Sequence, residues 1–283
     1  KYLQFISSKL SSAKRVQELE AIKLAIERKV HVNEYLKQQM LDEYQIQMPE
    51  VSYTTIQNIL TQNFATGSSK DAFKDVPILD DDWNIYHVFQ SLLNNEEFKR
   101  QVLEVIDYGI DLYKQEYSQR YQNTDLCLYK KYTYEDVCRL LNWQRNMNAQ
   151  NIGGYFYDAT TKTLPVFINY DKEEGISESI KYEDRLVDQN TIICFSKPRR
   201  TIESEDVVKI YSEKTNHVKI HLFIRKNKDD EASKEFYYLG LMHAYGEPIQ
   251  TTMSNTNNNV VQFTYKLENE IRKDIYDYIT NND

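Results

Sequence analysis

Glycine is scarce in this sequence of 283 residues: there are 7, and the only adjacent pair is Gly153-Gly154. Glycine-rich loops of the GxxxxGK[ST] and GxGxxG kinds cradle phosphates in nucleotide-binding proteins, because glycine lets the backbone approach the ligand closely. Neither pattern occurs in the chain. We therefore expect the chain to carry no nucleotide-hydrolysing engine of its own.

Cysteine is also rare. Cys127, Cys138 and Cys194 are widely spaced and odd in number, which argues against a disulfide framework and for a reducing compartment. There is no CxxC pair, no zinc-like Cys/His spacing and no run of about 18 apolar residues. We also expect no signal peptide. We expect a soluble, cytoplasmic protein. Because the chain does not begin with methionine, we interpret it as a piece of a longer polypeptide.

Positive charge is in the minority, and the formal net charge is -8. This balance disfavours nonspecific binding of nucleic acid through bulk charge, although a local basic patch is compatible with it. Hydrophobic residues make up 41% of the chain and aromatic residues 13%, with 23 tyrosines. That apolar content is enough for packed cores, so global disorder is not expected.

The pattern of apolar residues changes near residue 125. Residues 13–30 and 94–121 repeat apolar side chains every three or four positions, which predicts helices, and no long strand-like alternation occurs before residue 125. Further on, a capping box at 133–136 predicts a short helix. Strands are expected at 154–158 and 164–170, as a hairpin, and at 191–195, 217–225, 235–245 and 260–267, with helices at 203–213 and 268–279.

These patterns predict an α+β chain with two domains. Residues 1–125 would form an all-helical domain. Residues 126–283 would form a curled mixed sheet or small β-barrel with flanking helices.

Catalytic motifs fail on inspection. His217 and Lys219 begin an HxKxxxxD nuclease motif, but Ile224 stands where the aspartate belongs. The five histidines form no HExxH or HxH pair, and acids near lysines are too common to mark a metal-dependent nuclease. We predict no catalytic and no metal-binding residues.

Aromatic residues and acids suggest a different site. A flipped base needs two flat faces and a polar group at its Watson–Crick edge, and a cytosine amino group needs an acceptor there. Glu183 and Asp184 are suitable acceptors, and only one of them can face a pocket because adjacent strand residues point to opposite sides. The alternative for the aromatic residues is packing in the core. The alternative for the two acids is a salt bridge to Arg185 or to the basic residues at 197–200. The aromatic candidates are Trp143, Tyr155, Tyr157, Tyr182 and Phe195.

The segment "SKPRRT" is the densest basic spot and follows the strand expected at 191–195. Cations and hydroxyls in such a place suit the phosphate oxygens of a nucleic acid, although a solvated loop is the plainer interpretation. The candidates for contact with a DNA backbone are Arg185, Ser196, Lys197, Arg199, Arg200 and Thr201.

The segments "NIGGYFYD", "LPVFINY", "YEDR", "FSKPRRT" and "HLFIRK…FYYLG" resemble the C-terminal region of type IV modification-dependent restriction helicases. The helical residues 1–125 resemble the segment that joins this region to the helicase. The resemblance implies an SRA-like (PUA-like) barrel that binds double-stranded DNA containing 5-methylcytosine or 5-hydroxymethylcytosine and flips the modified base into an aromatic pocket.

The resemblance also implies partners and cofactors. Helicase and nuclease domains would belong to the same polypeptide, and ATP and Mg²⁺ would serve the helicase rather than this chain. The full protein would be an ATP-dependent, modification-dependent endonuclease in restriction and phage defence, while this chain would not be an enzyme. An alternative is a protein-interaction or dimerisation module, such as a homodimer, that regulates the helicase without reading bases. Its interface would use the tyrosine-rich residues 94–121. A PUA-like RNA binder is a third hypothesis.

Overall fold

The computed structural model describes residues 1–171, 184–227, 234–253 and 256–280. The chain divides into two compact units. We call the first the helical unit; it comprises Lys1–Cys127 and Glu135–Asn148. We call the second the sheet unit; it comprises Leu128–Tyr134 and Ala149–Asp283. The chain therefore passes from one unit to the other three times.

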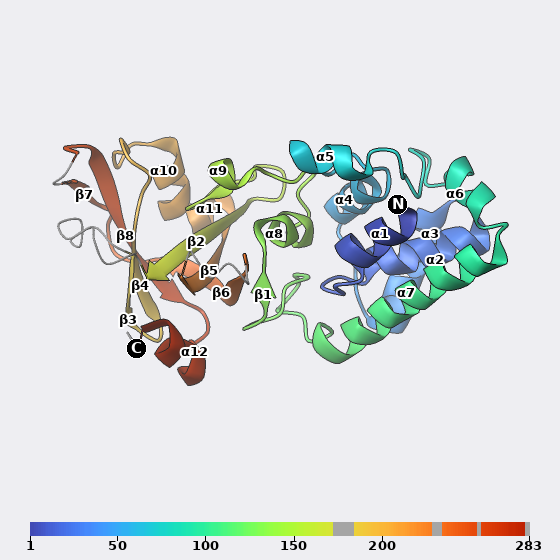
Figure 1. The fold of residues 1–283 in the computed structure, drawn as a ribbon. Helices are drawn as coiled ribbons and strands as arrows, with labels where there is room; N and C mark the ends of the chain where they lie inside the picture. The colour runs from blue at the N-terminus through green and yellow to red at the C-terminus, as the bar shows by residue number, and fades with distance from the viewer. Residues whose placement is uncertain (172–183, 228–233, 254–255, 281–283) are drawn as a thin grey trace. The chain divides into compact units, whose positions relative to one another are not determined.

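The helical unit is built around amphipathic helices (Figure 1). In α7, Val102, Ile106, Ile110 and Tyr113 recur at helical spacing and are buried. The side chain of Asn95 caps this helix by accepting the backbone N–H of Phe98 at 3.0 Å. The helices of this unit are α1 (Tyr2–Phe5), the π-helix η1 (Ile6–Leu10), α2 (Gln17–Arg28), α3 (Val32–Tyr44), α4 (Glu50–Leu60), α5 (Ser68–Phe73), α6 (His87–Leu92), α7 (Glu96–Glu116) and most of α8 (Tyr134–Leu140).

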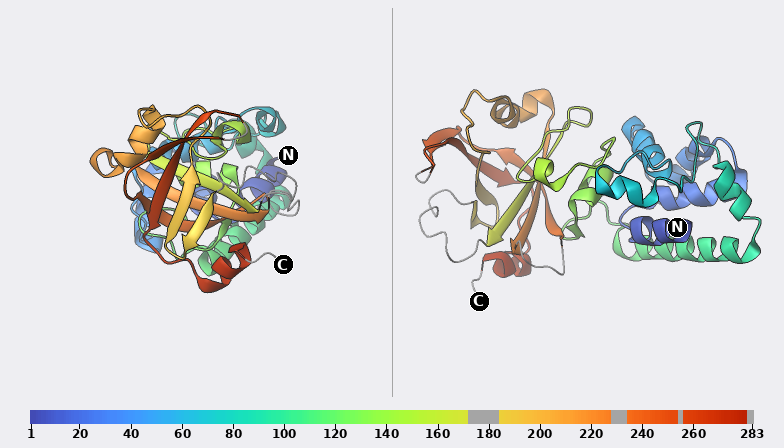
Figure 2. Two further views of the ribbon diagram at one scale, coloured as in Figure 1. Left: turned by 90° about the vertical axis from the view of Figure 1, so that its left-hand side faces the viewer. Right: turned by 45° about the horizontal axis from the view of Figure 1, so that its top comes forward.

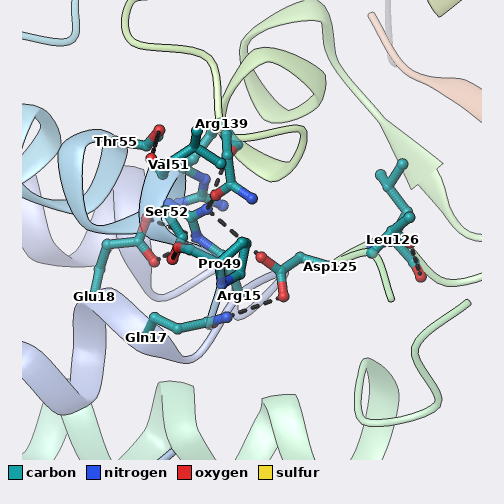
Figure 3. A network of polar contacts seen from close by, with 12 residues as sticks. Arg15, Gln17, Glu18, Pro49, Val51, Ser52, Thr55, Asp125, Leu126 and Arg139 are labelled. Carbon is teal, nitrogen blue, oxygen red and sulfur yellow. Dashed lines mark hydrogen bonds and ion pairs between the residues drawn. The ribbon is translucent and has the colours of Figure 1, made fainter. Parts of the chain in front are cut away.

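A buried network of charged side chains lies inside the helical unit (Figure 3). The Nε of Arg15 donates to both carboxylate oxygens of Glu18 at 3.0 Å, and both side chains are almost fully buried. A guanidinium nitrogen of Arg15 donates to the Arg139 carbonyl at 2.8 Å, and Asp125 lies 3.6 Å from Arg15. The network thus ties the start of α2 to α8 and to the segment that follows α7.

The sheet unit contains an eight-stranded mixed sheet within its described residues, strongly curved in Figure 2. Its strand order is β2-β5-β6-β8-β4-β3, with β1 paired to β6 and β7 paired to β8. Strands β2 and β5 are parallel, and the other pairs are antiparallel. The strands are β1 (Lys131–Tyr132), β2 (Thr163–Asp171), β3 (Arg185–Asp188), β4 (Thr191–Phe195), β5 (Lys219–Asn227), β6 (Phe236–Ala244), β7 (Ile249–Thr252) and β8 (Asn259–Leu267).

One hydrophobic core occupies the inner side of this sheet. It joins alternate residues of β2, β4, β5, β6 and β8, such as Leu222 and Phe263, to Ile210 and Ile275 from helices. The helices of the sheet unit are α9 (Ala149–Ile152), α10 (Glu205–Tyr211), α11 (Glu213–Asn216) and α12 (Lys273–Thr280). In Figure 1, α10 and α12 lie on opposite sides of the sheet. None of the described helices is long and apolar enough to cross a membrane.

The opposite face of the sheet is aromatic. Phe167 of β2 stacks on Phe223 of β5 with ring centroids 5.0 Å apart, and Tyr134 packs edge-on against Phe167 at 4.6 Å. His221 and Phe223, which alternate with the core residues of β5, are both fully buried. Strand β5 is therefore buried on both faces, as expected for a strand in the middle of a covered sheet.

The α+β class, the N-terminal helices and the C-terminal mixed sheet agree with the sequence prediction. Two local predictions were wrong in part. Residues 154–158 form no regular strand, although two isolated antiparallel bridges, Tyr155–Val166 and Asp158–Thr163, pair them with β2 as in the predicted hairpin. Helix α7 ends at Glu116, so the tyrosine pattern at 117–121 continues past the helix.

Candidate nucleic-acid interface

The β3–β4 hairpin positions an acid against the backbone of an aromatic residue. Arg185 pairs with Ile193 in this hairpin, so Asp184 lies one step further, at the end of β4. Its Oδ1 accepts the backbone N–H of Phe195 at 2.9 Å. Burial, and secondly the charge of Asp184, raise the pKa of Cys194 well above its ordinary value. Asp184 is thus fixed at the strand end by a main-chain hydrogen bond.

Tyr155 reaches the same strand end from the segment after α9. The backbone N–H of Lys197 donates to the Tyr155 hydroxyl at 3.3 Å, and the Lys197 ammonium lies 5.2 Å from the Tyr155 ring centroid. Gly154, with a φ of +80°, precedes Tyr155, and a Cβ there would lie 3.9 Å from Lys197 Cε. Because a positive φ favours glycine, Gly154 lets the chain turn into this position.

A cavity of about 320 Å³ opens beside Tyr155, and we call it the Tyr155 cavity. Its walls come from the segment after α9, from the turn after β4 and from α10. The lining residues are Tyr155, Phe156, Tyr157, Lys197, Arg200, Ser204, Glu205, Asp206 and Lys209.

Asp206 organises the inner wall of the Tyr155 cavity. Its Oδ2 accepts from the Tyr155 hydroxyl at 2.7 Å and from Arg200 Nε at 2.8 Å. Burial alone would raise the pKa of Asp206, but the hydrogen bonds from Arg200 and Tyr155 outweigh it and lower this pKa. Burial, together with the hydrogen bond to Asp206, raises the pKa of Tyr155. These three side chains form one connected polar group.

Lys209, like Lys197, lies over an aromatic ring at this cavity. The Lys209 ammonium lies 4.5 Å from the Tyr157 ring centroid and also pairs with Glu205. Burial, and secondly the charge of Arg200, lower the pKa of Lys197. Three cations and two carboxylates line the cavity, so its formal charge is +1 in a chain of net charge -8.

The structure thus brings together Tyr155, Tyr157, Lys197 and Arg200, and places Asp184 and Phe195 at the adjacent strand end. The sequence prediction missed Ser204, Asp206 and Lys209. The only signal for them was the amphipathic pattern of 203–213, which predicts a helix and does not tell which polar residues line a cavity.

Trp143 does not belong to this group, which corrects the sequence prediction. It lies in the helical unit, its side chain is only 2% exposed, and its carbonyl accepts the Thr55 hydroxyl at 3.0 Å. A fully packed indole has no face open to a base.

Ser196 is a second correction, because it is buried rather than exposed to a DNA backbone. Its hydroxyl accepts the backbone N–H of Val261 at 2.9 Å and donates to the Lys197 carbonyl at 3.0 Å. The hydroxyl therefore links the end of β4 to β8.

The other predicted residues lie apart from the cavity or outside the described residues. Arg185 and Arg199 are exposed, and the backbone of Arg199 is left-handed, with a φ of +65°. The backbone N–H of Thr201 donates to the Ser204 hydroxyl at 2.9 Å. Tyr182 and Glu183 lie outside the described residues, so their roles stay predictions.

Within the described ranges, no group of three or more His, Cys, Asp or Glu side chains could hold a metal ion. The three cysteines are buried and unbonded to one another. In α7, the apolar side chains of 94–121 mostly face the interior of the helical unit, and Tyr108, which is 64% exposed, is an exception.

Family models match both parts of the chain. The model described as "Domain of unknown function (DUF3427)" matches residues 126–279, which is more than half of the chain, and the chain belongs to this family. The model described as "Domain of unknown function (DUF8090)" matches residues 1–119. The first match begins close to the change in apolar pattern at residue 125.

Two solved structures share a distant likeness with the chain. The crystal structure of KRYPTONITE in complex with mCHG DNA and SAH has a TM-score of 0.37 and 11% identity, and that with mCHH DNA, an H3(1-15) peptide and SAH has 0.36 and 10%. Both alignments cover 65% of this chain and only 42% of the other. No curated protein compared with the chain matches it in sequence.

Proposed function

We propose that the sheet unit binds double-stranded DNA containing 5-methylcytosine or 5-hydroxymethylcytosine. The observation that carries the proposal is the convergence, at the end of β4, of an acceptor carboxylate, aromatic rings and cations from separate segments. The Asp184 carboxylate accepts the backbone N–H of Phe195 at 2.9 Å. Two residues after Phe195, the backbone N–H of Lys197 donates to the Tyr155 hydroxyl. A flipped cytosine requires such an acceptor and ring, and its flanking phosphates require cations.

In this proposal the curved sheet is the barrel of an SRA-like (PUA-like) fold. The modified base leaves the duplex and stacks on Phe195, and the carboxylate of Asp184 accepts from the cytosine amino group. Glu183 and Tyr182 remain alternatives for the acceptor and for the second ring. The cations beside β4 hold the backbone.

The chain would act as the target-recognition part of a type IV restriction enzyme in the cytoplasm. The helical unit would couple occupancy of the sheet unit to a helicase and nuclease in the same polypeptide, which use ATP and Mg²⁺. The chain itself would perform no catalysis. The threefold passage between units supports this coupling, because Lys131 and Tyr132 pair with β6 while the chain on both sides of residues 128–134 belongs to the helical unit.

Replacement of Asp184 by asparagine tests the acceptor. Asparagine keeps an oxygen for the Phe195 N–H but adds a donor where the cytosine amino group also donates. We expect D184N to lose preference for methylated over unmethylated duplex, because the flipped state loses its acceptor and only backbone binding remains. A correct donor–acceptor pair at a base edge is worth about 1–3 kcal/mol. The measurement is competitive fluorescence anisotropy with matched duplexes.

Two companion variants sharpen this test. Phe195→Ala should also lose the preference, because it removes a stacking face. Glu247→Gln makes the same charge change at an exposed position of the sheet unit and should keep the preference. If D184N and F195A both discriminate methylated DNA as well as the original chain does, the base site lies elsewhere.

A further inference from the structure

The two tyrosine rings at the Tyr155 cavity are already covered by cations. The Lys197 ammonium lies 5.2 Å from the centroid of the Tyr155 ring, and the Lys209 ammonium lies 4.5 Å from that of Tyr157. Tyr155 is only 5% exposed, and its hydroxyl is bonded to Asp206 and to the Lys197 N–H. A base that stacked on either ring would have to displace an ammonium group. The cavity is thus poorly suited to a base, in contrast to the sequence prediction for these two tyrosines.

The donors of the cavity suit an anion instead. Both lysines present ammonium groups, and Ser204 Oγ already accepts the Thr201 N–H at 2.9 Å, so its own hydrogen can be donated to a ligand. Arg200 uses its Nε for Asp206 and carries further N–H donors.

The acids of the cavity do not oppose an anion equally. Asp206 is half-buried and bonded to Arg200 and Tyr155, so its charge is compensated within the wall. Glu205 pairs with Lys209, but its side chain is 83% exposed. An exposed ion pair of this kind contributes little, so Lys209 can exchange Glu205 for a ligand at small cost.

We infer that the Tyr155 cavity binds one phosphate group of the DNA backbone, with Lys197, Lys209 and Ser204 as its donors and with Asp206 as the positioning residue that holds Arg200 and Tyr155. This inference rests on the proposed function, because the phosphate is one that flanks the flipped nucleotide. It divides the site into a base side, at Asp184 and Phe195, and a phosphate side, at the Tyr155 cavity.

The test is the salt dependence of DNA binding by the full 283-residue chain. Each lost phosphate contact lowers the slope of log K against log salt concentration by about 0.9. We expect Lys197→Gln and Lys209→Gln each to reduce the slope, by one contact at most because they share one phosphate, and to weaken methylated and unmethylated duplexes by the same factor. Lys214→Gln is the matched control, since Lys214 is exposed on α11 and does not line the cavity.

A second measurement locates the phosphate. Duplexes with one neutral methylphosphonate, moved along the phosphates that flank the methylcytosine, should include a position where K197Q and K209Q have no further effect. The inference would be overturned if K197Q and K209Q had the same salt slope as K214Q. It would also be overturned if the effects of these variants and of the methylphosphonate added up at every phosphate position.

The outcomes separate the inference from the proposed function. If the unmodified chain binds both duplexes equally and the cavity variants still lose slope, the phosphate site stands and base reading fails. If methyl preference is present and the cavity variants keep the slope, base reading stands and the phosphate site fails. Absence of DNA binding overturns both.

Discussion

Replacement of Glu18 by alanine should destabilise the helical unit by about 3–5 kcal/mol, the usual consequence of removing one partner of a buried ion pair. The Arg15 guanidinium has no exposed surface, and it donates to both oxygens of Glu18 at 3.0 Å. Without Glu18 this cation would remain buried, with Asp125 3.6 Å away as its nearest acid. The loss is therefore larger than that of two hydrogen bonds.

The measurement is urea unfolding followed by tryptophan fluorescence. The chain has two tryptophans, Trp83 and Trp143, and both lie in the helical unit, so the signal reports on that unit alone. Glu97→Ala is the matched control, because Glu97 pairs with Arg100 on the surface and should leave the unfolding midpoint unchanged. Equal midpoints for E18A and E97A would contradict the account.

The Glu18–Arg15 pair also determines whether the stability of the helical unit rises or falls with pH. Burial would raise the pKa of Glu18, but the charges of Arg15 and Arg139 outweigh it and lower this pKa. A carboxylate with a lowered pKa adds stability above its unfolded value, about 4.3. That stability is lost as the pH falls through the lower, folded value. The helical unit of the original chain should therefore lose stability on acidification, and E18A should lose less.

Replacement of Trp143 by alanine should cost the helical unit about 3–5 kcal/mol, as large-to-small changes of buried aromatic residues do. Its side chain is 2% exposed, and its backbone N–H donates to the Cys138 carbonyl at 2.9 Å. The remaining Trp83 reports the unfolding. Under conditions where the unit stays folded, we expect W143A to keep the preference for methylated DNA.

The control for Trp143 is Tyr108→Ala, since Tyr108 is 64% exposed on α7 and its loss should leave the midpoint in place. If W143A instead kept its stability and lost the preference for methylated DNA, Trp143 would be part of the base pocket.

The sequence predicted elements well wherever one periodicity dominates. The run at 191–195 coincides with β4, and the alternation at 260–267 coincides with β8 to within a residue. It did not reveal the return of Glu135–Asn148 to the helical unit. An amphipathic helix shows the same local pattern whichever unit covers its apolar face, so the predicted division at residue 125 could not include this exchange.

The candidate site was only partly predictable, for a similar reason. Asp184 and Phe195 were both candidates, but the hydrogen bond between them depends on the β3–β4 hairpin, whose irregular register the sequence did not predict. Asp206 and Lys209 join the site through tertiary packing of α10, which no local pattern encodes. Ser196 was misassigned because a hydroxyl beside cations resembles a phosphate ligand until its bond to Val261 is seen.

The central claim is that the sheet unit distinguishes a modified cytosine, and competition between matched duplexes that differ by one methyl group tests it directly. Burial of one methyl group contributes about 1 kcal/mol, so the methylated duplex should bind about fivefold more tightly. Equal affinity for both duplexes would contradict the account. Absence of binding to either would favour a protein-interaction module that regulates a helicase without reading bases.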